Sequence, residues 1–74
     1  MNILAFSTAR EQAGFSEMEV DVAPAETPRE ILRRVAPALD AEGMRAAVDC
    51  EYWGWDTAVG GGREMAIIPP VSGG

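Results

Sequence analysis

Hydrophobic and polar positions change their spacing several times along the chain, and these changes predict two strands in its first part. Residues 2–7 form a short apolar and aromatic run, which is typical of a strand. Residues 17–22 alternate between acidic and apolar side chains, which predicts a second strand, antiparallel and near a sheet edge, with one face in water. Residues 8–15 are polar and include Gly14, so a turn is expected to join the two strands into a hairpin.

Three signals together predict that a helix begins after Thr27. Threonine is a good N-cap, Pro28 suits the first helical position, and Glu30 completes a capping box. The apolar residues between positions 31 and 35 share one helix face. Pro37 cannot continue the hydrogen bonding of a helix interior, so we expect the helix to be short or to bend there.

The second half of the chain predicts further strands separated by glycine turns. Gly43 marks a turn, residues 44–51 alternate as a third strand, and residues 52–55 suit a short strand or an arch. The three glycines at 60–62 predict a turn, because glycine takes positive φ without strain. Residues 64–68 predict the last strand, which two prolines end because they lack an N–H donor.

This element order predicts an α+β fold of the β-grasp, or ubiquitin-like, class. In that fold one main helix crosses one face of a mixed sheet, and the helical crossover lets the last strand pair in parallel with the first. The alternative is a ferredoxin-like split βαβ fold, which needs a second helix that the glycine-rich region does not supply. The predicted organisation is a β-grasp domain over residues 1–68 and an extended tail over residues 69–74.

One helix can cover only one face of the central strands, yet both faces of the first and last strands carry apolar residues. We therefore expect Phe6 and Ile68, joined by Tyr52 or Trp53, to form an exposed apolar patch. Such a patch on a small protein usually marks an interaction site. The alternative is that the tryptophan-containing arch covers this face.

Composition narrows the classes of function. The chain has 74 residues and a net charge of −6, which argues against a phosphate-backbone partner, so no nucleic acid is expected, and favours a partner with a basic docking surface. One cysteine and no histidine argue against an internal disulfide and against a structural zinc site, so no metal is expected. No signal peptide or membrane-spanning segment is visible, so a cytoplasmic protein without membrane contact is expected.

A few single residues have two interpretations each. Cys50 is expected to be a small core residue, because no histidine or lysine is available to activate its thiol. Trp53 and Trp55 are expected to pack or to contact a partner. The glycines at 60–62 lack the residues of a phosphate-binding loop. Arg10 either binds an acidic partner group or is simply solvated.

The C-terminal segment is the best candidate for chemistry. Two prolines hold an extended path, and six residues from position 69 reach at most roughly 20 Å, which suits insertion into a neighbouring active site. Glycine has no Cβ, so the tip can enter a narrow channel. A glycyl carboxylate becomes reactive once ATP converts it to an acyl-adenylate. The candidate tail residues are Pro69, Pro70, Val71, Ser72, Gly73 and Gly74.

The segment IIPPVSGG, at residues 67–74, resembles the C-terminal signature of the small subunit of molybdopterin synthase, the MoaD-type sulfur carrier of the MoaD/ThiS ubiquitin-like family. The resemblance extends upstream through RAAVDCEYWGWDTAVGGGREMA, at residues 45–66, and includes ILAFSTAREQAG, at residues 3–14. It therefore spans nearly the whole chain, although the tail is its specific part.

The resemblance implies a carrier that is not catalytic alone and binds no cofactor tightly. An E1-like adenylating enzyme of the MoeB type would use ATP to adenylate Gly74, which would then become a thiocarboxylate. The tail would insert into the large synthase subunit, of the MoaE type, and donate sulfur to cyclic pyranopterin monophosphate (precursor Z) for molybdenum cofactor biosynthesis. Two carriers and two large subunits would form a heterotetramer. Phe6, Tyr52 and Ile68, with Arg10, match the partner interface.

Three alternatives remain beside the molybdopterin pathway. They are a sulfur carrier for thiamine thiazole or cysteine biosynthesis, a protein modifier that forms isopeptide bonds, and an interaction module with an inert tail. The two prolines favour the molybdopterin pathway. The chain departs from the family at Arg63, at Asp49 and in its two tryptophans, which affects partner details rather than the carrier role.

Overall fold

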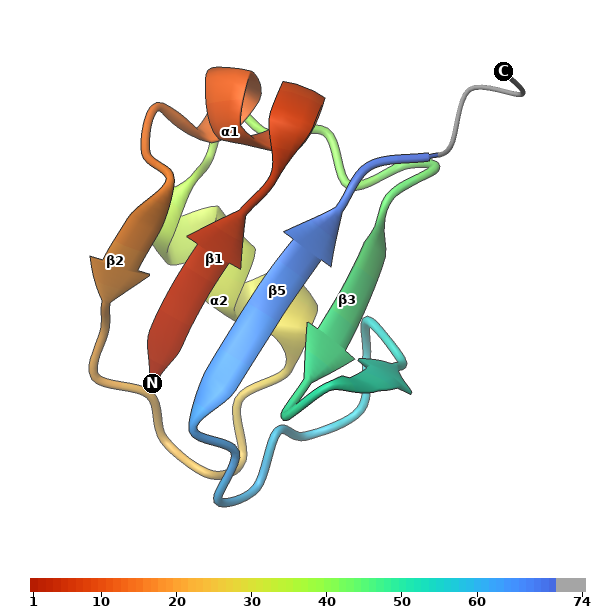
Figure 1. The fold of residues 1–74 in the computed structure, drawn as a ribbon. Coiled ribbons are helices and arrows are strands. Elements are labelled where there is room, and N and C mark those ends of the chain that lie inside the picture. Colours follow the sequence, from red (N-terminus) through yellow and green to blue (C-terminus); the bar gives the residue numbers. More distant parts are fainter. Residues whose placement is uncertain (71–74) are drawn as a thin grey trace.

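The computed structural model describes residues 1–70, which form two helices and five strands in one mixed sheet (Figure 1). The predictions for Val71, Ser72, Gly73 and Gly74 lie outside the described residues. In chain order the elements are β1 (Asn2–Ala5), α1 (Ser7–Ala13), β2 (Glu17–Glu19), α2 (Pro28–Val35), β3 (Arg45–Val48), β4 (Glu51–Trp53) and β5 (Glu64–Ile68).

The sheet has the strand order β2-β1-β5-β3-β4. The first and last strands pair in parallel at its centre, and the other neighbours are antiparallel. Helix α2 crosses one face and supplies the long connection that parallel pairing requires. The predicted β-grasp architecture is therefore confirmed.

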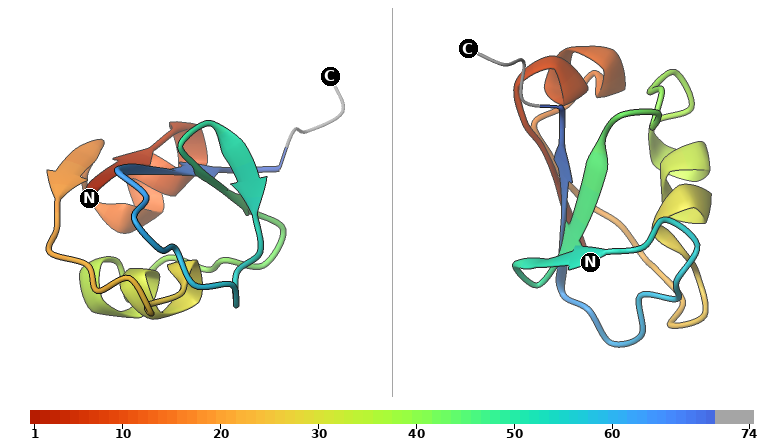
Figure 2. Two further views of the ribbon diagram at one scale, coloured as in Figure 1. Left: turned by 90° about the horizontal axis from the view of Figure 1, so that it is seen from below. Right: turned by 90° about the vertical axis from the view of Figure 1, so that its right-hand side faces the viewer.

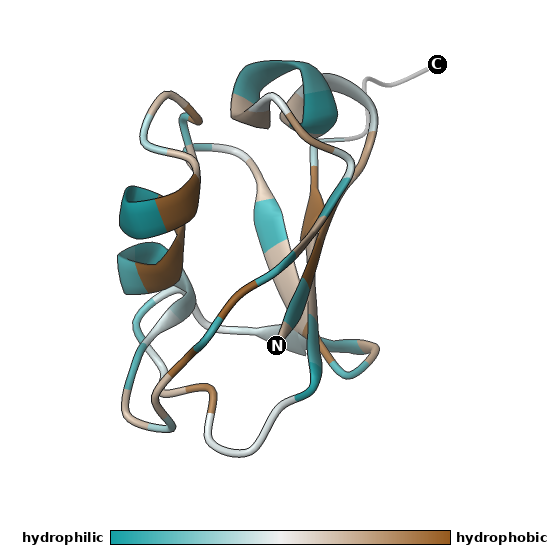
Figure 3. Ribbon diagram, turned by 90° about the vertical axis from the view of Figure 1, so that its left-hand side faces the viewer, coloured by the Kyte–Doolittle hydropathy of each residue, from teal (hydrophilic) through white to brown (hydrophobic). Residues whose placement is uncertain are grey.

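Helix α2 begins as the sequence predicts. The Thr27 hydroxyl accepts the Glu30 N–H at 3.2 Å, and the Glu30 carboxylate accepts the Thr27 N–H at 3.0 Å, so both parts of the capping box are present. Ile31 and Leu32 are buried against the sheet. Figure 3 shows the apolar side of α2 turned toward the strands and its polar side turned outward. The helix ends at Val35, two residues before the proline that cannot continue it.

The turn predicted for residues 8–15 is wrong, because this segment contains α1. Alanine, arginine, glutamate and glutamine all favour a helix, and Ala9, within this helix, is fully buried. Gly14 ends the helix with a φ of 85° and donates its N–H to the Arg10 carbonyl at 3.0 Å. The first strand consequently ends at Ala5, two residues earlier than predicted.

The antiparallel pairing of the first two strands is confirmed, but α1 rather than a hairpin turn connects them. Strand β2 is short and wholly exposed, which agrees with the predicted edge position. It ends at Glu19 instead of residue 22 because its antiparallel partner β1 begins opposite Glu19, at Asn2, and beyond this pair the Val20 N–H donates to the Met1 carbonyl at 2.9 Å. Val20 and Val22 also pack against the core.

The predicted third strand over residues 44–51 is interrupted by a tight turn. Strand β3 stops at Val48, and Asp49 and Cys50 have φ angles of 50° and 69° before β4 begins. Two successive positive φ angles define a type I′ turn, which matches the twist of a hairpin. Cys50 is exposed in this turn, so the prediction of a core cysteine is wrong.

The hydrophobic core lies between α2 and one face of the sheet. Figure 2 shows α2 standing to one side of the strands, with no helix on the opposite side among the described residues. The core is formed by Ile3, Ala5, Ala9, Ile31, Leu32, Ala36, Leu39, Met44, Val48, Val59, Met65 and Ile67.

Candidate functional site

The sheet face opposite α2 carries the candidate site, and we call it the open face. Side chains that point outward from the central strands are only partly covered there. They surround a shallow hollow of about 410 Å³. The hollow is lined by Leu4, Phe6, Ala47, Cys50, Tyr52, Glu64, Ala66 and Ile68.

The register of the strands explains the hollow. Leu4 lies beside Ala66, Ala66 beside Ala47, and Ala47 beside Tyr52, so these four side chains form one row across the sheet. The two central alanines are small, whereas the leucine and the tyrosine at the ends are large. The row is therefore low in the middle and raised at its ends.

A second row of side chains lies at the end of the sheet where β5 ends and the chain continues into the tail. Phe6 donates its N–H to the Ile67 carbonyl at 3.3 Å, which places Phe6 beside Ile68. Phe6 is 49% exposed and Tyr52 is 70% exposed, and both are unusually open for large hydrophobic residues. The predicted apolar patch is present, whereas its role in binding stays a prediction.

The choice between Tyr52 and Trp53 is settled by the pairing of β4. Trp53 lies opposite Ala46, whose side chain is buried on the covered side, and its indole N–H donates to the Thr57 carbonyl at 3.1 Å. Trp55 donates its indole N–H to the Met44 carbonyl at 3.1 Å. Both indoles pack against the core, which confirms the packing interpretation of the tryptophans.

The tail leaves the sheet next to this second row. Pro69 follows Ile68 directly and is half-buried, while Pro70 is exposed. A Cβ built on Gly43 would lie 3.8 Å from the Pro70 ring, so the start of the tail runs beside the loop that precedes β3 (Figure 1). The open face therefore reaches the base of the tail. The other predicted tail residues, 71–74, lie outside the described part of the chain.

Two arginines lie near this site, and only Arg10 was a candidate from the sequence. Arg10 is exposed on α1, and none of the three ion pairs within residues 1–70 includes it, so both interpretations of Arg10 stand. Arg45 was not singled out from the sequence. It lies opposite Ile68, and its guanidinium carbon is 5.1 Å from the centroid of the Tyr52 ring. Its position two residues before Ala47, on the same strand face, was the available signal.

Three carboxylates lie on the part of the open face near β2 and the start of β5. Glu17 and Glu19 project from β2 in register with Leu4 and Asn2, and Glu64 lies beside Asn2 on β5. The Asn2 side-chain amide donates to the Glu17 carboxylate at 2.9 Å. The open face thus changes from acidic at β2 to apolar at its centre and basic at Arg45.

Two ion pairs that each make two hydrogen bonds involve arginines of α2. The Arg29 guanidinium donates to the Asp56 carboxylate at 2.8 Å and 3.2 Å, which lowers the pKa of Asp56 and raises the pKa of Arg29. The Ala23 N–H and then Arg34 lower the pKa of Glu26. These exposed pairs fasten loops to the helix and take no part in the open face.

Two further sequence predictions concern metals and membranes. Within residues 1–70, no three side chains of metal-ligating type come together. Neither helix in that range has the length and hydrophobicity to cross a bilayer.

Comparisons with known proteins agree with this fold. The sequence model of the ThiS family matches residues 3–74. The molybdopterin synthase sulfur carrier subunit of Haemophilus influenzae is 35% identical over 80 aligned positions, which cover 100% of this chain and 99% of that protein.

Two solved structures resemble the whole chain. The crystal structure of SAMP1 from Haloferax volcanii has a TM-score of 0.74 and 26% sequence identity. The alignment covers 99% of this chain and 97% of the SAMP1 chain. A Pyrococcus furiosus protein provisionally called molybdopterin converting factor, subunit 1, has a TM-score of 0.71 and 20% identity, with 95% of each chain covered, and this likeness supports the fold alone. On the family match and the full-length relative, the chain belongs to the ThiS family.

Proposed function

We propose that this protein is the sulfur carrier subunit of a molybdopterin synthase, with the Gly74 carboxylate as the group that carries sulfur. The observation that carries the proposal is the apolar open face that continues to the base of a diproline tail. A docking surface directly beside the tail lets one binding event orient the segment that must enter the partner. The full-length similarity to a sulfur carrier subunit supports the same function.

The proposed chemistry has two loading steps, and an E1-like adenylating enzyme of the MoeB type catalyses the first. A Gly74 carboxylate oxygen attacks the α-phosphorus of ATP, and diphosphate leaves to give an acyl-adenylate. A sulfide-level nucleophile then attacks the acyl carbon, and AMP leaves to give a thiocarboxylate. This chain supplies the acyl group and the docking surface, while its partners supply the catalysis and the ATP site.

The proposed unloading partner is the large synthase subunit, of the MoaE type. It would dock on the open face through Phe6, Tyr52 and Ile68 and receive the tail in its active site. Large exposed aromatic residues beside a hollow are suited to this, because they bury much area at a small cost in side-chain entropy. Sulfur would pass to cyclic pyranopterin monophosphate (precursor Z), within a heterotetramer of two carriers and two large subunits.

Mass spectrometry of the intact protein tests the loading steps. The chain is incubated with ATP, an adenylating enzyme that is active on another carrier, and sulfide. The expected result is a mass gain equal to the replacement of one oxygen by sulfur. Deleting Gly74 is expected to abolish the gain and leave the circular dichroism spectrum unchanged, while Ser72→Ala keeps the tail length and serves as the control. An unchanged wild-type mass contradicts the proposal.

A protein-modifier function is the second candidate, because the 26% identical structural neighbour, SAMP1 of Haloferax volcanii, is a small archaeal modifier protein. Incubation with ATP, an adenylating enzyme and a cell extract distinguishes the two functions. Covalent conjugates to other proteins through Gly74 favour a modifier, and a free thiocarboxylate favours a sulfur carrier. The pathway follows from the large protein that co-purifies, since a synthase large subunit indicates molybdopterin and a thiazole synthase indicates thiamine.

A further inference from the structure

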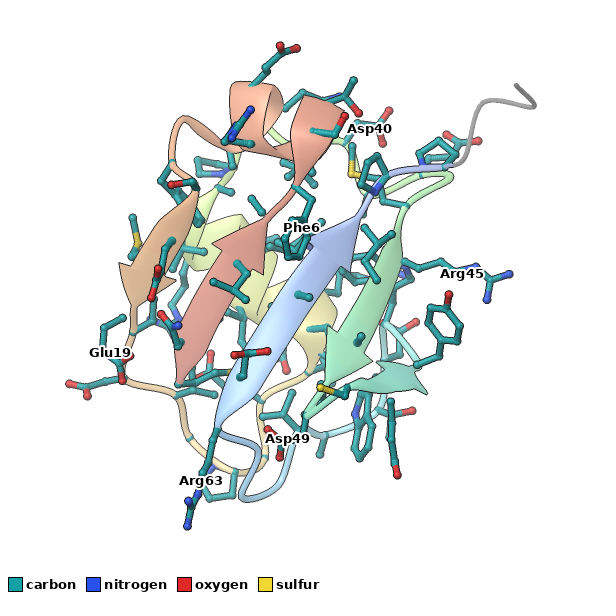
Figure 4. All side chains as sticks on the ribbon, viewed as in Figure 1. Phe6, Glu19, Asp40, Arg45, Asp49 and Arg63 are labelled. Carbon is teal, nitrogen blue, oxygen red and sulfur yellow. The ribbon has the colours of Figure 1, made fainter. Side chains whose placement is uncertain are left out.

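Arg45 places a positive charge on the open face, at the end of the sheet where the tail begins. It lies opposite Ile68, the last residue of β5, and therefore next to the start of the tail. Figure 4 shows its side chain projecting beside β3, toward the opposite edge of the sheet from Glu19. The acidic side of the open face is thus separated from Arg45 by the apolar hollow.

An aromatic ring holds this guanidinium in place, and no carboxylate among residues 1–70 forms an ion pair with it. Its carbon lies 5.1 Å from the Tyr52 ring centroid, which is a cation–π contact. None of the three ion pairs within residues 1–70 involves Arg45, although the chain has twelve acidic residues. Stacking uses the flat face of a guanidinium and leaves the N–H groups along its edge free for a carboxylate.

Arg45 and its neighbours are of residue types that are common in protein interfaces. Tyrosine and arginine are over-represented among the residues that dominate binding energy. Tyr52 and Phe6 are exposed large side chains on the same face, and a stacked arginine loses less side-chain freedom when it binds a partner. An exposed arginine held beside an apolar hollow is therefore suited to a carboxylate at the edge of a docked protein.

We infer that Arg45 determines partner specificity by binding a carboxylate of the synthase large subunit at the point where the tail enters it. This inference rests on the proposed function and adds the charge pattern of the partner. The docking surface of the large subunit should have an apolar centre, an acidic residue facing Arg45, and basic residues facing Glu17 and Glu19 on β2. The last feature complements the acidic side of the open face.

Calorimetric binding of the unmodified carrier to the large subunit of the same organism tests the inference. Arg45→Glu is expected to weaken binding by roughly tenfold or more, because it places like charges together, and Arg45→Gln by less. Arg63→Glu is the matched control, because it makes the same charge change on an exposed residue at the other end of β5. The control should stay within about twofold of the wild type.

The salt dependence of binding and a compensating charge change in the large subunit test whether Arg45 acts through its charge. Wild-type affinity should fall as salt rises, and Arg45→Gln should show a weaker salt dependence. Replacing one surface carboxylate of the large subunit by lysine should restore the binding of Arg45→Glu. If Arg45→Glu and Arg63→Glu bind equally well, Arg45 is a solvated surface charge and the inference is wrong.

The outcome is separate from that of the proposed function. Gly74 loading is read by mass and needs no large subunit. If the wild-type chain is not loaded, the carrier function fails whatever Arg45 does. If it is loaded and Arg45→Glu binds the large subunit as the wild type does, only the inference about Arg45 fails.

Discussion

Ile67 and Ile68 are adjacent and chemically identical, yet they lie on opposite faces of the sheet. Ile67 is fully buried against α2, whereas Ile68 is partly exposed on the open face beside Phe6. The covered face holds the fold together, because its side chains are removed from water. The open face leaves apolar side chains in contact with water, which is the arrangement expected of a surface kept for a partner.

The largest expected effect on stability is at the covered face. Ile67→Ala removes a fully buried side chain and leaves a cavity, so we expect it to lower the free energy of unfolding by about 2–5 kcal/mol. Ile68→Ala should cost about 1 kcal/mol or less, because much of that side chain is already in water. Denaturant unfolding of both variants measures the difference. Equal losses would contradict the division of the sheet into two faces.

The second effect concerns binding through the open face, where the exposed residue Ile68 matters more than it does for stability. Ile68→Ala is expected to weaken binding to the synthase large subunit by about 1–3 kcal/mol, as for a residue in the centre of an interface. Calorimetry with the same two proteins measures it. Met18→Ala is the control, because Met18 is similarly exposed but lies opposite Ile3, whose side chain belongs to the covered face. Equal weakening by the two variants would argue against the open face as the docking surface.

A third, smaller effect tests the turn that brings Tyr52 to the open face. The Asp49 carboxylate accepts the Arg63 and Glu64 N–H groups at 3.0 Å and 3.1 Å, and Asp49 itself has a positive φ. Asp49→Ala should lower the free energy of unfolding by about 1–2 kcal/mol, because both hydrogen bonds are lost and alanine tolerates this φ poorly.

Asn is the conservative replacement at this turn. Asp49→Asn keeps an acceptor oxygen and tolerates the left-handed region, so its unfolding midpoint should stay close to that of the wild type. If Asn and Ala destabilise equally, the carboxylate charge rather than the turn geometry is what matters.

The smallest effect is a pH dependence on the α2 side. Arg29 lowers the folded-state pKa of Asp56, so the pair contributes stability above the unfolded pKa, near 4, and loses it as pH falls through the lower folded value. Thermal unfolding at neutral and acidic pH should show a slightly smaller acid-induced drop for Asp56→Asn than for the wild type. The difference should be small because the pair is exposed, and high salt should reduce it. Identical drops would show that the pair is screened out.

Local signals predicted the elements whose causes lie within a few residues. The capping box at Thr27 correctly gave the start of α2, and the glycine turn before residue 64 and the two prolines after Ile68 correctly gave the bounds of β5. The alternation also placed Phe6 on the face opposite the helix. The predicted turn at residues 8–15 failed because a polar surface helix of seven residues has little hydrophobic period to detect, with only Ala9 buried.

The sequence by itself determined the order of the strands around α2, the two-sided apolar character of the central strands and the family resemblance, because these depend on the spacing of residue types along the chain. Only the tertiary structure decided that Cys50 lies in an exposed turn, that Tyr52 rather than Trp53 joins the open face, and that Arg45 stacks beside the base of the tail. Strand register brings together residues from distant parts of the chain, and a shift of one residue would exchange the two faces.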